Sequence, residues 1–219
     1  MHIALIGGTG KEGLGLGVRW TKAGHRVAIG SRDTARARTR AEEIGARCGS
    51  RVLAGDNLSA AAEADVIVLC VPYAAHEDTV RQLAPILSGQ VVIDITVPLR
   101  PPDISRVHLP QGQAAALEAQ RLLGDRAAVV AALHHVSSIH LAGNDEHIDC
   151  DVLVCTDDPE ARRTSLALVH DLGMKGLDAG PLVNAIALES FTPILLHLNK
   201  QRQATQRSGA GVGLRITGV

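Results

Sequence analysis

The sequence predicts an α/β fold: a doubly wound, mostly parallel sheet with helices on both faces, followed by a small C-terminal helical appendage. Short apolar segments rich in β-branched residues alternate with longer amphipathic segments, which is typical of successive βαβ units. The alternation stops after residue 180, where one long apolar segment and a glycine-rich tail follow. We therefore expect one domain over residues 1–180 and a small helical segment over residues 181–219.

Seven segments are expected to be strands because they are short, apolar and β-branched, as strands buried on both faces are. They cover residues 2–6, 26–30, 51–54, 65–71, 90–94, 127–133 and 151–155. Helices are expected over residues 11–23, 34–48, 74–87, 114–123, 159–172 and 182–206. Residues 96–112 hold four prolines, so this stretch is expected to connect elements without forming a long helix.

Composition excludes several classes of function. The chain carries 22 Lys+Arg against 23 Asp+Glu, and a net charge of -1 gives no general attraction to nucleic acid or acidic membranes. Aromatic residues make up 1% of the chain, which argues against base-stacking platforms. No run of about 18 consecutive apolar residues is present, so no membrane span is expected. The four cysteines form no C-x-x-C pair, and we expect reduced thiols in a cytoplasmic protein.

Two kinds of site are considered and rejected near residues 134–151. Histidines, cysteines and acids are frequent there, but their spacing matches no zinc pattern, so no metal site is expected. Ser137 and Ser138 lie close to His134 without a G-x-S-x-G elbow, so a hydrolase is not expected either.

The first expected turn has the pattern of a phosphate-binding loop. Gly8, Gly10 and Gly13 fit G-x-G-x-x-G, between an expected strand and an expected helix. The first glycine allows the tight turn, the second lets the backbone approach a pyrophosphate, and the third lets helix and strand pack closely. The N–H groups at the helix start then face the anion. This pattern predicts a Rossmann-type dinucleotide site.

The end of the second expected strand predicts which dinucleotide binds. An NAD-preferring site usually has an acid here that accepts a hydrogen bond from the ribose 2′-hydroxyl. This chain has Ser31 and Arg32, with Arg36 one helical turn further on, and these residues suit a 2′-phosphate. Asp33 could instead accept from the ribose, although its position favours a helix N-cap. We therefore expect NADP in preference to NAD.

Three further strand ends outline a slot for the nicotinamide. The fourth, fifth and sixth expected strands each change from apolar residues to a turn that contains Pro, Ser or Thr. These turns are residues 70–73, 94–99 and 133–138. Ligands of such sheets lie beyond the carboxyl ends of the strands, so the three turns are expected to form apolar walls with small polar rims.

The sequence resembles the NADPH:coenzyme F420 oxidoreductase family over essentially the whole chain. Coenzyme F420 is a deazaflavin. The motifs that carry the resemblance are Gly7-Gly8-Thr9-Gly10, Ile29-Gly30-Ser31-Arg32, Val71-Pro72-Tyr73, Thr96-Val97-Pro98-Leu99, Asp149-Cys150-Asp151-Val152-Leu153-Val154-Cys155, Asp178-Ala179-Gly180-Pro181-Leu182 and Arg215-Ile216-Thr217-Gly218. The glycine motif is common to many dehydrogenases, whereas residues 178–182 and the C-terminal segment are far more specific.

The resemblance implies two sets of contact residues and no catalytic side chain. NADP would be bound by Gly8, Thr9, Gly10, Lys11, Glu12, Gly13, Ser31, Arg32, Arg36, Val71, Pro72, Val97, Ser137 and Ser138. The deazaflavin pocket would be built largely by residues 181–219. Its contact residues would be Leu195, Leu196, Val212 and Gly213 from that segment, together with His134. A hydride would pass directly between the two cofactor rings, so the protein would supply orientation and a dry site.

The partners implied are therefore two small-molecule cofactors, with no nucleic acid and no membrane, and the resemblance also favours a homodimer. Two alternative functions stay open at this point. An NADPH-dependent flavin or ferric reductase would keep the dinucleotide and change the acceptor. A non-catalytic NADP-binding redox sensor would use the apolar C-terminal helix to contact a partner protein.

Overall fold

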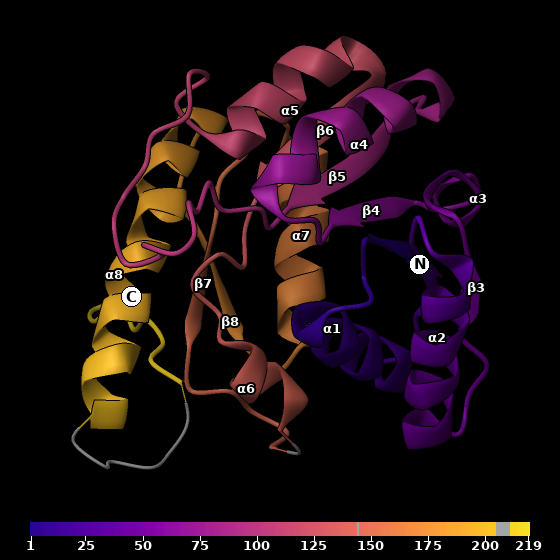
Figure 1. Cartoon of the computed structure of the whole chain (residues 1–219), viewed down its shortest axis with the longest axis horizontal. Helices are drawn as coiled ribbons and strands as arrows, with labels where there is room; N and C mark the ends of the chain where they lie inside the picture. The colour runs from indigo at the N-terminus through magenta and orange to yellow at the C-terminus, as the bar shows by residue number, and fades with distance from the viewer. Residues whose placement is uncertain (144, 205–210) are drawn as a thin grey trace.

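A six-stranded parallel sheet forms the centre of the fold (Figure 1). The structure is a computed structural model that describes residues 1–143, 145–204 and 211–219. In spatial order the strands are β3 (Leu53–Gly55), β2 (Arg26–Gly30), β1 (His2–Ile6), β4 (Val66–Leu69), β5 (Gln90–Asp94) and β6 (Ala127–Ala131). The order reverses between β1 and β4, and a doubly wound sheet leaves a crevice at such a point. The predicted fold class is confirmed.

Helices cover both faces of this sheet. One face is covered by α1 (Lys11–Lys22), α2 (Thr34–Cys48) and α7 (Pro159–Asp171), and the other by α3 (Asn57–Ala61), α4 (His76–Leu83) and α5 (Ala115–Leu123). Strand β1 shows how the sequence supplies both cores. Ile3 and Leu5 pack into the first core, while Ala4 and Ile6 pack into the second, because successive side chains of a strand point to opposite faces.

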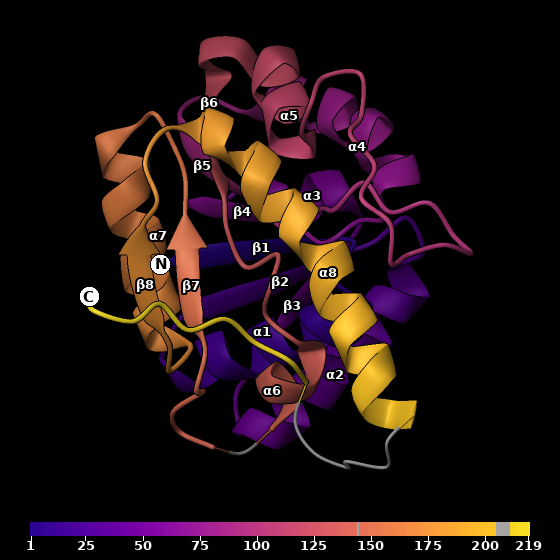
Figure 2. The same cartoon turned by 90° about the vertical axis from the view of Figure 1, so that its left-hand side faces the viewer.

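The C-terminal part adds a second, smaller layer beside β6. Strands β7 (Asp151–Val154) and β8 (Lys175–Asp178) form a parallel pair, which an isolated antiparallel bridge from Ala131 to Cys155 joins to β6. The short helix α6 (Ser138–Ala142) precedes β7, and the long helix α8 (Ala185–Ala204) follows β8. Figure 2 shows the tail, residues 211–219, crossing the start of β7 and continuing towards β8. The Asp151 N–H donates to the Leu214 carbonyl at 2.8 Å.

Several elements differ from the expected boundaries for local reasons. The helix expected over residues 74–87 is divided into η1 (Tyr73–Ala75), α4 and η2 (Ala84–Ile86). Helix α4 ends before Pro85 because proline cannot continue the α-helical hydrogen bonds. Strand β6 stops at Ala131, and Leu133 has a φ of 67°. Strand β8 was not expected, because its four residues, Lys175–Asp178, include a glycine between charged ends. The irregular stretch over residues 96–112 is confirmed.

Two further short elements complete the chain: η3 (Gly124–Arg126) before β6 and η4 (Leu182–Asn184) before α8. The segment Leu182–Arg202 is long and apolar enough to cross a membrane by length and composition alone. Its buried side chains Leu182, Leu188 and Leu195 pack against the body of the fold. The core helix of a water-soluble protein satisfies the same criterion.

Candidate cofactor site

The expected glycine turn joins β1 to α1. A Cβ atom on Gly13 would lie 2.2 Å from the Gly8 carbonyl oxygen, so only glycine allows this approach of helix and turn. A Cβ atom on Gly10 would meet nothing within 4 Å. Gly10 is the N-cap of α1 and offers no side-chain cap, so the first-turn N–H groups are left for another acceptor. These properties fit an anion at the start of α1.

The end of β2 and the start of α2 form a cationic corner next to this turn. Ser31 is buried, and its Oγ accepts a hydrogen bond from the Asp33 N–H at 3.1 Å. The Asp33 carboxylate caps α2 through the N–H groups of Ala35 and Arg36 at 3.0 and 3.1 Å, as its position favours. Arg32 and Arg36 have exposed side chains and no ion pair within the described parts of the chain.

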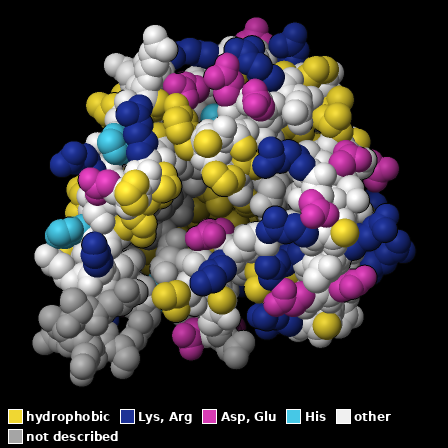
Figure 3. Space-filling model, viewed as in Figure 1, with side chains coloured by type: hydrophobic (Ala, Val, Ile, Leu, Met, Phe, Trp, Pro, Cys, Tyr) yellow, Lys and Arg dark blue, Asp and Glu magenta, His cyan; other side chains and the backbone are white. Residues whose placement is uncertain are grey.

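One cavity of about 820 Å³ connects the glycine turn, the cationic corner and α8. Figure 3 shows this hollow near the middle of the face seen in Figure 1. The expected site residues that line it are Thr9, Gly10, Glu12, Ser31, Arg32, Arg36, Val71, Pro72, Val97, His134, Ser137, Ser138, Leu195, Leu196 and Val212. The fold therefore brings together residues from both ends of the chain.

Four expected site residues do not line the cavity. Gly8 and Gly13 lie inside the turn, where they set its shape. Lys11 is exposed at the start of α1. Gly213 packs against Cys150, where a Cβ atom would lie 3.1 Å from the sulfur. Another cavity, of about 620 Å³, lies at the β3 edge and shares no lining residue with the first.

Sequence reasoning missed several lining residues whose positions depend on the fold. They are Gly7, Asn57, Ala75, Thr79, Thr192 and Asn199. The other lining residues come from the cationic corner and from the three turns that the sequence predicts as walls: Asp33, Cys70, Ile95, Thr96, Leu99, Leu133, His135 and Val136. Asn57 is the most informative of the missed residues, because its Oδ1 is buried without a hydrogen-bond partner. It begins α3 directly beside Gly30, where a Cβ atom would come within 3.1 Å of that oxygen. No local motif marks this position.

His134 forms an apolar part of the wall, although it is a titratable residue. The side chain is buried, and neither ring nitrogen has a hydrogen-bond partner. Burial lowers the pKa of His134 to about 4, so the imidazole is neutral at physiological pH. Its backbone carbonyl accepts a hydrogen bond from the Thr192 hydroxyl on α8 at 2.8 Å. Neighbouring His135 instead bonds the Asp151 carbonyl at 2.9 Å, and burial lowers its pKa as well.

We expect the His134 imidazole to make stability depend on acid pH. Because the folded-state pKa lies below the unfolded value of about 6.5, its contribution is present above pH 6.5 and is lost as the pH falls towards 4. Wild type should therefore lose up to about 3 kcal/mol of unfolding free energy relative to His134→Leu over that range. Denaturant unfolding at a series of pH values measures this difference. Parallel pH curves for the two proteins would contradict it.

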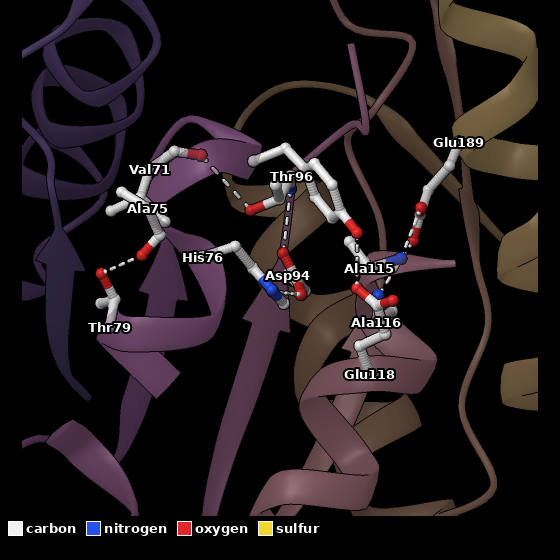
Figure 4. Close-up of polar contacts among 11 residues, drawn as sticks. Val71, Ala75, His76, Thr79, Asp94, Thr96, Ala115, Ala116, Glu118 and Glu189 are labelled. Atoms are coloured by element: carbon white, nitrogen blue, oxygen red, sulfur yellow. Dashed lines mark hydrogen bonds and ion pairs between the residues drawn. The ribbon is translucent and has the colours of Figure 1, made fainter. Parts of the chain in front are cut away.

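A buried ion pair lies behind the wall, between β5 and α4 (Figure 4). His76 Nε2 and Asp94 Oδ2 are 2.6 Å apart, and the Thr96 N–H donates to the other Asp94 oxygen at 2.9 Å. Burial opposes both charges, but the pair outweighs it: the pKa of Asp94 is lowered and that of His76 is raised. The pair does not line the cavity, although Ala75, Ile95 and Thr96 beside it do. Within the described residues no group of three or more His, Cys, Asp or Glu side chains could hold a metal ion.

Comparison with known proteins identifies the family. The sequence profile of the family described as NADP oxidoreductase coenzyme F420-dependent matches residues 2–98. An F420-dependent NADP reductase of Methanothermobacter thermautotrophicus is 36% identical over 227 aligned residues, which cover 100% of this chain and 96% of the relative. The chain belongs to the coenzyme F420-dependent NADP oxidoreductase family. The family membership inferred from the sequence motifs is therefore confirmed.

Another relative agrees with this assignment, and solved structures share the fold. The F420-dependent NADP reductase of Methanocaldococcus jannaschii is 33% identical, with 100% of this chain and 99% of the relative covered. A provisionally assigned F420-dependent NADP reductase from Arthrobacter sp. FB24 superposes with a TM-score of 0.77 at 24% identity, over 92% of this chain and 94% of the other. A reductive aminase from Aspergillus terreus in complex with NADPH has a TM-score of 0.65 at 17% identity, over 93% and 62% of the two chains. At such identities the structural matches show the fold alone.

Proposed function

We propose that this chain transfers a hydride between NADP(H) and the deazaflavin coenzyme F420, within the cavity of about 820 Å³. The observation that carries the proposal is that one cavity joins the glycine turn and cationic corner to a wall supplied by α8. A site for two cofactors needs such a junction, because both reactive rings must meet. The relatives that cover the whole chain are named F420-dependent NADP reductases, which supports the same activity.

The residues present fit NADP at one end of the cavity. The uncapped start of α1 suits the pyrophosphate, with Thr9, Gly10 and Glu12 around it. Ser31, Arg32 and Arg36 suit the 2′-phosphate, because the hydroxyl and both guanidinium groups are donors. The walls from Val71, Pro72, Val97, Ser137 and Ser138 would then enclose the nicotinamide.

The deazaflavin would occupy the end of the cavity beside α8. His134, Leu195, Leu196 and Val212 give that end a largely apolar lining suited to a flat ring. In this assignment residues 1–180 form the NADP-binding domain and residues 181–219 complete the deazaflavin pocket. We also place the protein in the cytoplasm as a homodimer. Its four cysteines are free, and a second copy would cover Phe191, Ile194 and Leu198, which are exposed along α8.

The bound cofactors would supply both the hydride donor and the hydride acceptor, and the side chains would orient the rings and exclude water. Alignment of this kind accounts for about 7–11 kcal/mol of a barrier in favourable cases. The wall at the ring end offers no ready acid or base: His134 is buried and neutral, His135 bonds the Asp151 carbonyl, and the His76–Asp94 pair lies behind the lining. The lining carboxylates, Glu12 and Asp33, belong to the glycine turn and the cationic corner. No catalytic side chain is therefore assigned.

Replacement of His134 by alanine is expected to lower kcat by only about tenfold, because the imidazole fills space and transfers no proton. Steady-state kinetics with NADPH and coenzyme F420 measure this change, and circular dichroism reports whether the variant is folded. A loss of about four orders of magnitude in a folded variant would show that acid–base catalysis is essential.

The activity is tested by following NADPH absorbance with coenzyme F420, with a flavin and with a ferric chelate in separate reactions. Oxidation with the deazaflavin alone is the expected result. Oxidation with flavin or ferric iron would favour a flavin or ferric reductase. Tight NADPH binding without turnover on any acceptor would favour a redox sensor. Sedimentation velocity of the same sample tests the homodimer.

A further inference from the structure

Helix α8 forms one wall of the cavity, so its position sets the width of the slot. Thr192, Leu195, Leu196 and Asn199 all lie on α8 and line the cavity. The opposite walls come from the carboxyl ends of the strands, which belong to the sheet. Any contact that fixes α8 against the helices of the sheet therefore acts on the width of the slot.

Glu189 makes such a contact one helical turn before Thr192. Its side chain is buried, and its two carboxyl oxygens accept hydrogen bonds from the N–H groups of Ala115 at 2.7 Å and Ala116 at 3.0 Å (Figure 4). These two residues begin α5, whose N-cap residue Ala114 provides no side-chain cap. Glu189 on α8 thus caps the N-terminus of α5, a task that a neighbouring residue in the chain usually performs.

The surroundings of Glu189 contain more acid than base. Glu118 on α5 and Asp94 on β5 are the nearby carboxylates, Tyr73 on η1 is the nearby phenol, and His76 on α4 is paired with Asp94. Burial is the main reason that the pKa of Glu189 is raised to about 8; Asp94 and Glu118 act in the same direction, and the two N–H groups oppose them. The side chain therefore holds a proton through the neutral range, and ionisation above it disfavours the packed position.

We propose that Glu189 is a positioning residue, which holds α8 against the start of α5 and so sets the deazaflavin end of the slot. This inference rests on the proposed function, because it assigns the α8 wall to the deazaflavin. Glu189 does not line the cavity, so it acts through the helix that carries the lining residues. The NADP end, built on α1 and α2, should be independent of it.

The test compares Glu189→Ala with Asp158→Ala, measuring the Kd for NADPH and the Kd for coenzyme F420 separately by fluorescence. Asp158 is a matched control, because its carboxylate caps α7 through the Ala161 N–H at 2.7 Å and does not line the cavity. Glu189→Ala should raise the deazaflavin Kd by about tenfold or more and leave the NADPH Kd unchanged. Asp158→Ala should change neither. An unchanged deazaflavin Kd, or equal losses for both cofactors, would overturn the proposal.

Two further measurements separate positioning from general folding. The deazaflavin Kd of wild type should rise as the pH passes through about 8, whereas that of Glu189→Gln, which cannot ionise, should not. Without any cofactor, Glu189→Ala should increase hydrogen exchange at the start of α5 and along α8. Unchanged exchange there would overturn the proposal. A wild type that binds NADPH but no deazaflavin would overturn the proposed function instead, and the exchange result would still decide whether Glu189 holds α8.

Discussion

Replacement of Gly10 by valine is expected to weaken NADPH binding by about 100-fold or more and to leave the fold intact. The φ of -80° and ψ of -174° at Gly10 are open to any residue, and a Cβ atom there meets nothing within 4 Å. The protein itself therefore has room for the side chain. The same space is where the backbone must approach the pyrophosphate. Fluorescence titration with NADPH and the thermal midpoint measure the two effects.

Gly13→Ala provides the contrast, because the same kind of change should act on the protein itself. A Cβ atom would lie 2.2 Å from the Gly8 carbonyl oxygen, so the turn or the helix must move. Overpacking of this kind costs roughly 1–3 kcal/mol, and the thermal midpoint should fall. A Gly10→Val variant that bound NADPH as tightly as wild type would show that the pyrophosphate does not lie against this turn.

Removing both guanidinium groups of the cationic corner, with Arg32→Ala and Arg36→Ala together, is expected to weaken NADPH binding by about 100-fold. NADH binding should stay nearly unchanged, since NADH lacks the 2′-phosphate. The reason is that each charged hydrogen bond to a phosphate contributes roughly 1.5–3 kcal/mol, and exposure of these side chains reduces that amount.

Arg38→Ala is the matched control for this double variant. Arg38 is an exposed arginine on the same helix, α2, and does not line the cavity. Its removal should leave the Kd values of NADPH and NADH unchanged, whereas a general effect of positive charge on α2 would weaken NADPH binding in both variants. Equal losses of NADPH and NADH affinity in the double variant would contradict a 2′-phosphate role.

Sequence reasoning predicts the glycine turn and the cationic corner because their signals are local. Gly8, Gly10 and Gly13 define a turn within six residues, and Ser31 and Arg32 directly follow a strand. The alternation of apolar segments likewise predicts the order of strands and helices. In each case the residues that form the feature are neighbours in the chain, so their spacing is enough.

The parts that sequence reasoning missed depend on residues brought together by the fold. His76 meets Asp94 across 18 positions, and Glu189 reaches Ala115 across 74. Asp94 alone offers a weak signal, as a carboxylate ending an otherwise apolar strand. Its burial and its partner follow only from the packing of α4 on the sheet. Strand β8 was missed for a different reason, because its four residues are too few and too polar to show a strand pattern.

The most direct test of ring-to-ring transfer uses NADPH carrying deuterium at the transferred C4 position, in a single turnover with coenzyme F420. The cavity joins the expected nicotinamide and deazaflavin ends and offers no ready side-chain acid or base between them. We therefore expect the deuterium to appear on C5 of the reduced deazaflavin, with none exchanged into water. Loss of the label to solvent during the turnover would contradict direct transfer between the two rings.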